Sequence, residues 1–470
     1  PGGVPMNYQE FLKSKARKVP MTGLKSVPAL NSNLFDYQKA VTSWACKRGR
    51  AALFAGTGLG KSLMELSWAN ALYEANGERT IIFTPLAVAA QMKREAVKFG
   101  IDADHVSCDS DSNKPIVITN YQKLDHFDLS KYRGVILDES SILKNQSGHY
   151  RTRLIKTCDQ IPYRLAATAT PSPNDYMELG NHSEFCGIMS YTDMLSTFFV
   201  HDAAKTQDWR LKGHAESEFW RWMATWSVML QSPEDMGFDG TAHKLPELIQ
   251  EQHIVGAKYE PNMEMGLLFP LEAQSMGERL KARRATIEDR VNKAVEIVQE
   301  KTDTPWVVWC NLNDESAMIA DRIPGAVEIV GSQTEEKKEQ ILEGFATGAI
   351  RVLVSKPSLT GFGMNWQHCN NTCFVGLNDS FEQIYQAIRR FWRFGQKNKV
   401  YAHFIASELE GAVVANIKRK ELQCEHMMQQ MVKHMADLSA ATVRGAVRDT
   451  LNYVPTQEIQ LPDFLNHATN

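Results

Sequence analysis

The chain alternates short apolar runs with longer segments whose apolar residues recur at helical spacing. Such runs are typical of buried parallel strands that are joined by crossover helices. In the first part of the chain the expected strands are 51–55, 80–84, 116–119, 135–137 and 164–167. A second series follows at 306–310, 326–330, 351–355, 372–377 and 400–405. The pattern therefore predicts an α/β protein with two lobes, each built on a parallel sheet.

The segment between the two series has a different character, because four of the ten tryptophans fall close together there. Helical spacing links Phe219, Trp222, Trp226 and Met229, which predicts an amphipathic helix. Packing in a helical subdomain is the simpler interpretation of these rings, and a stacking platform for nucleic acid is the alternative.

A chain of 470 residues is too long for one core. We therefore expect a basic N-terminal extension, a first lobe, a helical insertion with linker, a second lobe and a helical C-terminal tail. The expected boundaries are 1–30, 31–180, 181–290, 291–410 and 411–470.

A glycine-rich turn directly follows the first expected strand. Residues 55–62 read Ala-Gly-Thr-Gly-Leu-Gly-Lys-Ser, which is the layout of a phosphate-binding loop. Glycines let several backbone N–H groups point at one anion, and the following helix N-terminus adds positive charge. We expect Lys61 to reach the β- and γ-phosphates of a nucleoside triphosphate and Ser62 to ligate Mg²⁺. The expected phosphate-binding residues are Gly56, Thr57, Gly58, Gly60, Lys61 and Ser62.

Two adjacent acids end another expected strand, at Asp138 and Glu139. A carboxylate at the carboxyl end of a strand can hold Mg²⁺ through its water shell, and a second can orient an attacking water. We assign the first role to Asp138 and the second to Glu139. Two buried acids without a role would be costly to desolvate.

A pair of arginines stands three residues apart in the second part of the chain, at Arg390 and Arg393. On a helix they would share a face and approach one anion together. Planar guanidinium groups suit the charge that spreads over a transferring phosphoryl group. We expect Arg389 beside them to be a surface residue.

The order of these segments resembles a superfamily-two helicase motor of compact bacterial or phage type, and most of all its Swi/Snf-related branch of double-stranded DNA translocases. The matching segments are 34–38 (Leu-Phe-Asp-Tyr-Gln), 55–62, 81–85, 118–121, 138–141, 168–174, 360–365 and 386–396. Two departures stand out. Ser140 and Ser141 replace the Ala-His of that family, which puts its usual coupling route in doubt, and Ala169 replaces a glycine.

The resemblance implies a fold of two RecA-like lobes and further residue roles. Gln38 reads adenine, Gly361 and Asn365 complete the nucleotide site from the second lobe, and Arg393 is the arginine finger with Arg390 as its partner. The residues implied in coupling or nucleic-acid contact are Thr84, Pro85, Thr119, Tyr121, Thr168, Thr170, Pro171 and Gln386.

The resulting expectation is an ATP-hydrolysing, Mg²⁺-dependent translocase on double-stranded or branched DNA. A strand-separating helicase on DNA or RNA remains an alternative. So does a motor subunit that works with a separate nuclease, replication or repair chain. A non-hydrolysing, ATP-gated clamp is the alternative of a different class, and the intact acids and arginines argue against it.

Charge and cysteine content refine this picture. The net charge is −3, yet residues 1–50 carry nine Lys and Arg against two acids, and residues 389–399 carry five without any acid. Local basic surface suits a polyanion. The eight cysteines form no Cys-x-x-Cys pair, which indicates a reducing compartment and argues against a zinc site. We expect a cytoplasmic monomer without a membrane segment.

Overall fold

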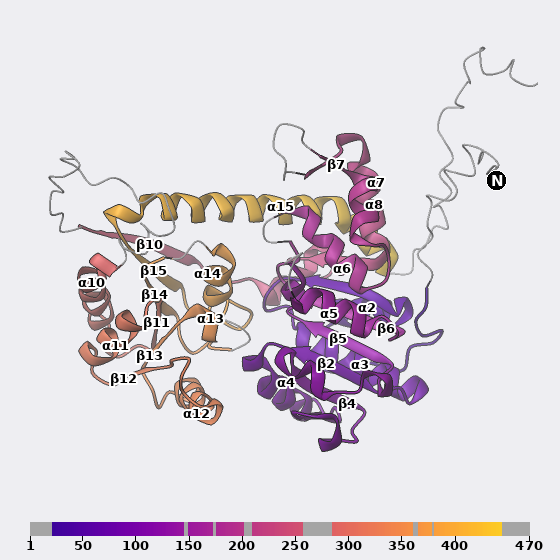
Figure 1. Ribbon diagram of the computed structural model, residues 1–470, viewed down its shortest axis with the longest axis horizontal. Helices are drawn as coiled ribbons and strands as arrows, with labels where there is room; N and C mark the ends of the chain where they lie inside the picture. Colours follow the sequence, from indigo (N-terminus) through magenta and orange to yellow (C-terminus); the bar gives the residue numbers. More distant parts are fainter. Residues whose placement is uncertain are drawn as a thin grey trace, which may run out of the picture.

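The structure is a computed structural model that describes residues 21–144, 149–172, 175–201, 209–256, 284–360, 365–377 and 380–443. Two parallel sheets dominate it, and one long helix runs across both (Figure 1). No helix in these ranges is long and apolar enough to cross a membrane.

Lobe 1 is built on a seven-stranded sheet with the order β3-β4-β2-β5-β6-β1-β9, in which every pairing is parallel. Its central strands are buried from end to end, as their unbroken apolar runs require. The strands are β1 (Arg50–Ala55), β2 (Thr80–Thr84), β3 (Ala103–His105), β4 (Ile116–Asn120), β5 (Gly134–Asp138), β6 (Tyr163–Thr168) and β9 (Ser227–Leu230). The accompanying helices are α2 (Asp36–Arg48), α3 (Lys61–Asn76), α4 (Leu86–Lys98) and α5 (His149–Cys158).

Lobe 2 is built on a six-stranded parallel sheet with the order β10-β15-β14-β11-β13-β12. Its strands are β10 (Leu248–Val255), β11 (Trp306–Cys310), β12 (Ala326–Glu328), β13 (Val352–Ser355), β14 (Asn371–Val375) and β15 (Val400–Ser407). Its helices are α10 (Ile287–Gln299), α11 (Asn313–Arg322), α12 (Glu335–Ala346), α13 (Pro357–Thr360) and α14 (Phe381–Ile388). The two-lobed α/β fold predicted from the apolar pattern is confirmed.

The segment between the lobes differs from the helical insertion that we expected. It contains α6 (Leu179–Phe185), α7 (Tyr191–Phe198), the hairpin of β7 (Phe199–His201) and β8 (Trp209–Leu211), and α8 (Glu216–Trp226). The helix predicted through Met229 is wrong, because α8 ends at Trp226 and the next residues form β9. Local spacing is overridden there by pairing with β1, which buries all four residues of β9.

The same segment therefore gives one strand to each lobe, β9 to the first sheet and β10 to the second. Trp220 and Trp226 are buried in the core, so these two rings pack the subdomain and do not form an exposed stacking platform.

The described part of the C-terminal tail is one long helix, α15 (Gly411–Val443), which follows the last strand of lobe 2 and reaches lobe 1, where it packs against α8 and β9 (Figure 1). There the His434 ring stacks on the Trp220 ring, with 5.7 Å between centroids and an interplanar angle of 7°. Met431 and Met435 are buried in the same contact region. The helix thus connects the lobes in addition to the linker between them. The predicted tail beyond 443 lies outside the described residues, as does most of the N-terminal extension.

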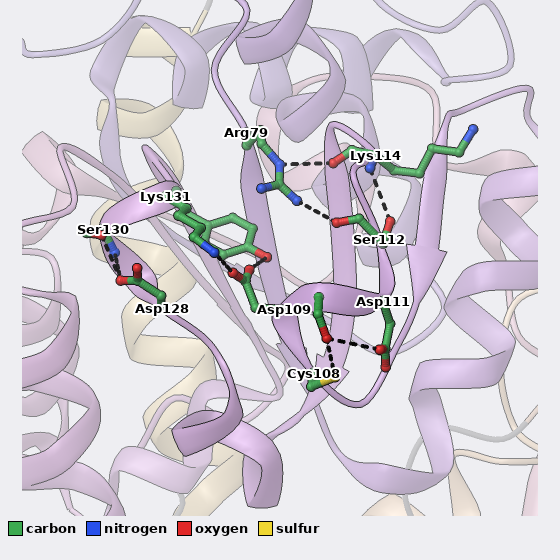
Figure 2. Close-up of polar contacts among 11 residues, drawn as sticks. Arg79, Cys108, Asp109, Asp111, Ser112, Lys114, Asp128, Ser130 and Lys131 are labelled. Carbon is green, nitrogen blue, oxygen red and sulfur yellow. Dashed lines mark hydrogen bonds and ion pairs between the residues drawn. The ribbon is translucent and has the colours of Figure 1, made fainter.

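A polar network occupies the amino-terminal edge of the lobe 1 sheet (Figure 2). Arg79 donates to the backbone oxygens of Ser112 and Lys114 at 3.1 and 3.2 Å. Asp109 pairs with Lys131 and accepts from Tyr132. These residues precede or join β2, β4 and β5 and fix their connections. The loops at the opposite, carboxyl edge are the ones that carry the chemistry predicted above.

Candidate active site between the lobes

The glycine-rich loop connects β1 to α3 and has a backbone that only glycine adopts without strain. Gly58 and Gly60 have φ of 92° and 74°, in the region that side chains disfavour. A Cβ on Gly60 would lie 2.3 Å from the Gln38 Nε2 atom, and one on Gly58 would lie 2.8 Å from the Phe394 nitrogen. Phe394 belongs to lobe 2, so the loop is in direct contact with the other lobe.

The first turn of α3 holds the two polar residues expected to meet phosphate and metal. The Lys61 Nζ atom donates to the Ala55 backbone oxygen at 3.0 Å, so its ammonium lies back over the loop. Ser62 is half-buried beside it. The Gly56 nitrogen donates to the Leu230 oxygen at 2.9 Å, which means that β9 supports the loop from the edge of the sheet.

Gln38 lies against the loop from α2. Its buried side chain donates from Nε2 to the Leu59 oxygen at 2.9 Å and accepts from the Phe35 nitrogen at 2.8 Å. The Tyr37 hydroxyl donates to the same Leu59 oxygen at 3.0 Å. Both ends of the Gln38 amide are therefore engaged with the protein, and the predicted adenine contact remains a prediction.

An aromatic cluster that the sequence did not reveal borders the same loop. His243 stacks on Phe394 with 4.7 Å between centroids, and Phe35 meets both rings edge-on at 5.2 and 6.0 Å. These rings come from three segments that are far apart in sequence, so no local pattern could have indicated them. The adjoining cavity is lined by Gly56, Thr57, Gly58, Leu59, Gln231, His243, Leu245, Tyr385, Arg389 and Phe394.

The paired acids stand at the carboxyl end of β5. Asp138 is buried, and burial together with the Glu139 carboxylate raises the pKa of Asp138 to about 7. Glu139 has φ of 51° and is the single non-glycine residue with positive φ in the described ranges; such strain is characteristic of functional sites. The Thr168 hydroxyl donates to Glu139 Oε2 at 3.3 Å, which links the acids to the end of β6.

Glu65 is a third carboxyl group that the sequence analysis missed. It is completely buried on α3, and neither carboxyl oxygen has a hydrogen-bond partner. Burial and the Asp138 carboxylate raise the pKa of Glu65 well above its usual range, while Lys61 opposes the shift. Its position four residues after Lys61, on the same helix face, was the available indication.

These groups fit a magnesium-bound nucleotide. Ser62, Asp138 and Glu65 offer oxygen atoms alone, which Mg²⁺ prefers. The two buried Glu65 oxygens, which have no hydrogen-bond partner, are available to such a cation.

The two predicted arginines lie in lobe 2, but not on a helix as we expected. Helix α14 ends at Ile388, and both follow it in turns. The Arg390 side chain donates from Nε and Nη2 to the backbone and side-chain oxygens of Gln386, each at 3.0 Å. These two hydrogen bonds fix the Arg390 guanidinium against Gln386, at the end of α14.

Both arginines are largely buried and feel the charge of the acids of lobe 1. Burial, and secondarily Arg393, lowers the pKa of Arg390 to about 10, while Glu139 and Asp138 act in the opposite direction. Burial also lowers the pKa of Arg393, against the effect of Glu95 and Glu139. The arginine segment also lies against the phosphate loop, because a Cβ on Gly58 would lie 3.5 Å from the Arg393 Cβ atom.

Arg389 is a further residue of this interface, although we expected it on the surface. Its guanidinium stacks on the Trp392 ring at 4.3 Å and on the Tyr385 ring at 5.0 Å, and it lines the cavity beside the phosphate loop. In the sequence, its position directly before Arg390 was the indication that it belongs to the same site. Another interlobe contact is the ion pair of Lys144 with Glu382.

Several residues expected to couple hydrolysis to nucleic acid are buried. Thr84, Thr119 and Gln386 have no exposed surface. Tyr121 stacks on Phe83 at 6.2 Å and donates to the Asp138 backbone oxygen at 2.6 Å. These four side chains are therefore buried where nucleic acid does not reach them in this structure. Their role in coupling remains a prediction.

The other members of that set lie nearer to the acids or to the surface. Thr170 and Pro171 are buried next to Thr168, whose hydroxyl accepts from the Thr170 nitrogen at 3.1 Å. Pro85 is half-buried and Asn365 is exposed, away from the cavity. Gly361 lies outside the described residues.

The serine that departs from the family pattern has a histidine beside it. Ser140 Oγ lies 3.1 Å from His182 Nε2, and the His182 ring packs edge-on against Phe54 at 5.2 Å. His182 belongs to α6, outside the lobe 1 sheet, and is fully buried. The segment after the acids therefore contacts a histidine that comes from another part of the chain.

Comparisons with known proteins agree with this architecture. Residues 31–173 match the family described as type III restriction enzyme, res subunit, and residues 289–395 match the helicase conserved C-terminal domain. No curated protein matches the chain. Among solved structures, the SWI2/SNF2 ATPase core of Sulfolobus solfataricus in complex with double-stranded DNA is similar at 18% identity and a TM-score of 0.41, over 89% of this chain and 98% of that chain.

Proposed function

We propose that this chain, which belongs to the superfamily-two helicase-type ATPases, is a translocase that moves along double-stranded DNA. It is an ATP-hydrolysing nucleic-acid motor. The observation that carries the proposal is the contact of the phosphate loop of lobe 1 with the arginine segment of lobe 2, where a Cβ on Gly58 would lie 2.8 Å from the Phe394 nitrogen and 3.5 Å from the Arg393 Cβ atom.

The phosphate loop would bind the triphosphate through its backbone and through Lys61. That ammonium now donates to the Ala55 oxygen, so nucleotide binding requires it to exchange this contact for phosphate oxygens. Mg²⁺ held by Ser62 and Asp138 would neutralise charge on the phosphates. Glu139 would orient the attacking water as its general base.

Closure of the lobes would place Arg390 and Arg393 against the charge that develops during phosphoryl transfer, for which an arginine can contribute a factor of about 10³–10⁵ in rate. The direct contact between Gly58 and Phe394 means that small movements of lobe 2 alter the loop itself. Hydrolysis would then change the lobe arrangement, as expected when domain closure completes a site.

The contact of Thr168 with Glu139 supports a route from hydrolysis to nucleic acid. It connects the water-orienting acid with the loop after β6, where the family resemblance implies coupling. The preference for double-stranded DNA is supported by the order of motifs, which resembles that of the double-stranded DNA translocases. Phosphate contacts would dominate such binding.

The decisive experiment measures ATP hydrolysis with single-stranded DNA, duplex DNA, branched DNA and RNA at one salt concentration, because phosphate contacts make affinity salt-dependent. Stimulation by duplex DNA, with displacement of a bound triplex strand and no separation of the duplex, supports the proposal. Separation of the duplex indicates a strand-separating helicase. Activity only with a copurifying nuclease indicates a motor subunit, and absence of phosphate release under all conditions indicates a clamp.

Two variants test the residue roles. Lys61→Ala should abolish hydrolysis while the fold remains intact; normal turnover would contradict the site. Arg393→Ala should bind ATP but lose hydrolysis. Lys397→Ala removes a nearby exposed charge from the same basic stretch and serves as the control for Arg393.

A further inference from the structure

A cluster of metal-binding side chains lies in lobe 2, on two strands that take no part in the ATP site. β10 pairs with β15 in parallel along its whole length, and Glu251 stands opposite His403 in the register. His253 lies two residues beyond Glu251, on the same face of β10. The three side chains therefore converge on one face at the edge of the sheet, where the strands run side by side (Figure 1).

The donor atoms have the spacing of a metal site. His253 Nε2 lies 3.1 Å from His403 Nδ1, which lies 3.3 Å from Glu251 Oε2, and the remaining pair is 3.8 Å apart. Tetrahedral bonds of about 2.0–2.1 Å, as zinc forms with nitrogen and oxygen, place ligand atoms about 3.3–3.4 Å from one another. The three atoms thus outline one face of a tetrahedron and leave its fourth corner open.

Hydrogen bonds between neutral imidazoles cannot satisfy all three contacts. If His253 carries the proton on Nε2, the lone pairs of His403 Nδ1 and Glu251 face each other at 3.3 Å. If His403 carries it on Nδ1, one hydrogen is shared between two acceptors, His253 Nε2 and Glu251 Oε2, which present lone pairs to each other at 3.8 Å. Protons on both nitrogens collide at 3.1 Å. One cation between the three atoms satisfies every contact at once.

We propose that Glu251, His253 and His403 form a binding site for a divalent transition metal ion of the zinc type. Imidazole nitrogen donors select such ions over Mg²⁺, which prefers oxygen. The expectation that the chain has no zinc site rested on its cysteines, and this arrangement uses none.

Burial gives the site a fixed inner side and an open outer side. The His403 side chain is 9% exposed and packs on the Trp306 ring at 5.7 Å, whereas those of His253 and Glu251 are 22% and 46% exposed. Metal can enter from solvent past Glu251, and the open corner can take water. The ion would fasten the edge strand that arrives from lobe 1 to the strand that leads into α15, so its role is independent of ATP hydrolysis.

The test uses the full chain, freed of metal with EDTA. Zn²⁺ affinity is measured by competition with a chromophoric chelator, and coordination is measured from the visible absorption of added Co²⁺. We expect one tight equivalent of Zn²⁺ and the intense absorption of four-coordinate Co²⁺. His253→Ala and Glu251→Gln should each weaken Zn²⁺ binding at least tenfold and remove that absorption.

Controls separate metal binding from folding. His126→Ala removes an exposed histidine of lobe 1 and should bind Zn²⁺ like the wild type. Circular dichroism and ATP hydrolysis of His253→Ala report whether both lobes remain folded; because this residue is partly exposed, we expect them to remain so. The proposal is overturned if the wild type binds Zn²⁺ no more tightly than folded His253→Ala, or if its Co²⁺ spectrum shows six-coordination.

Discussion

Replacement of Asp138 by asparagine should stabilise the nucleotide-free protein while it abolishes ATP hydrolysis. Burial and the adjacent Glu139 carboxylate raise the pKa of Asp138 from its usual 3.8 to about 7 in the folded chain. The folded state therefore disfavours ionisation of the Asp138 carboxyl group. The asparagine side chain has nearly the same shape and cannot ionise, so it removes that conflict.

The size and pH range of the effect follow from the pKa difference. Below pH 3.8 the carboxyl group is protonated in both states and has no effect. As the pH rises from about 4 to 7 the unfolded chain ionises and the folded chain does not, so the wild type loses stability. Each unit of difference between the folded and unfolded pKa corresponds to about 1.4 kcal/mol. The free energy of unfolding of the wild type is therefore lowered by about 4 kcal/mol above pH 7. About 3 kcal/mol of this falls between pH 5 and 8.

The assay is urea unfolding followed by circular dichroism at pH 5 and pH 8, without magnesium or nucleotide. The stability advantage of Asp138→Asn over the wild type should grow by about 3 kcal/mol between these pH values. Asp36→Asn is the matched control, because that carboxyl group is 88% exposed and surface substitutions change stability little. An advantage that is the same at both pH values, or that decreases with pH, would refute the reasoning.

Three further predictions concern the same interface. The stability advantage of Glu65→Gln over the wild type should also grow as the pH rises, because burial and Asp138 raise the pKa of Glu65 and the wild type therefore loses stability. Glu74→Gln, on the exposed side of α3, should show no such advantage. Equal urea midpoints for Glu65→Gln and the wild type at pH 8 would contradict this. Gly58→Ala should lower ATP hydrolysis at least tenfold in a phosphate-release assay, because its Cβ would lie 2.8 Å from the Phe394 nitrogen. The control is Gly100→Ala, which also has positive φ but has open space around its Cβ position. Lys144→Glu should reduce ATP hydrolysis, because it breaks the interlobe ion pair with Glu382. The double variant Lys144→Glu/Glu382→Lys should restore part of the activity. Equal activity of the single and double variants would exclude the ion pair as the cause.

Much of the fold could be predicted because each central strand is a continuous apolar run. Burial on both faces demands such runs, and β1, β2, β4, β5 and β11 begin and end within one residue of the predicted limits. The edge strands β9 and β10 escaped for different reasons. Met229 of β9 continues the helical spacing of α8, and β10 has four polar residues at its centre. Their identity depends on partner strands that lie far away in sequence.

The candidate site was predictable where one segment carries its own chemistry. The phosphate loop and the acids are of this kind, since a strand followed by a turn fixes where their side chains emerge. Arg389 and the aromatic cluster of Phe35, His243 and Phe394 acquire a place only when the lobes meet. The spacing of Arg390 and Arg393 suggested a helix, but α14 ends at Ile388, and Arg390 bonds back to Gln386 from the turn that follows.

The departure at Ser140 shows why motif comparison alone leaves the coupling route open. A serine in place of alanine adds a hydroxyl group, which in a buried position needs a partner. His182 provides it at 3.1 Å, and α6, which carries His182, packs on the segment 140–144 after the acids. Ser141 stands where the resembling family has a histidine. In this chain His182, from outside the sheet, contacts the neighbouring Ser140 instead. Helix α6 is therefore in direct contact with the residues that follow the acids, on the opposite side of them from the phosphate site predicted in the loop.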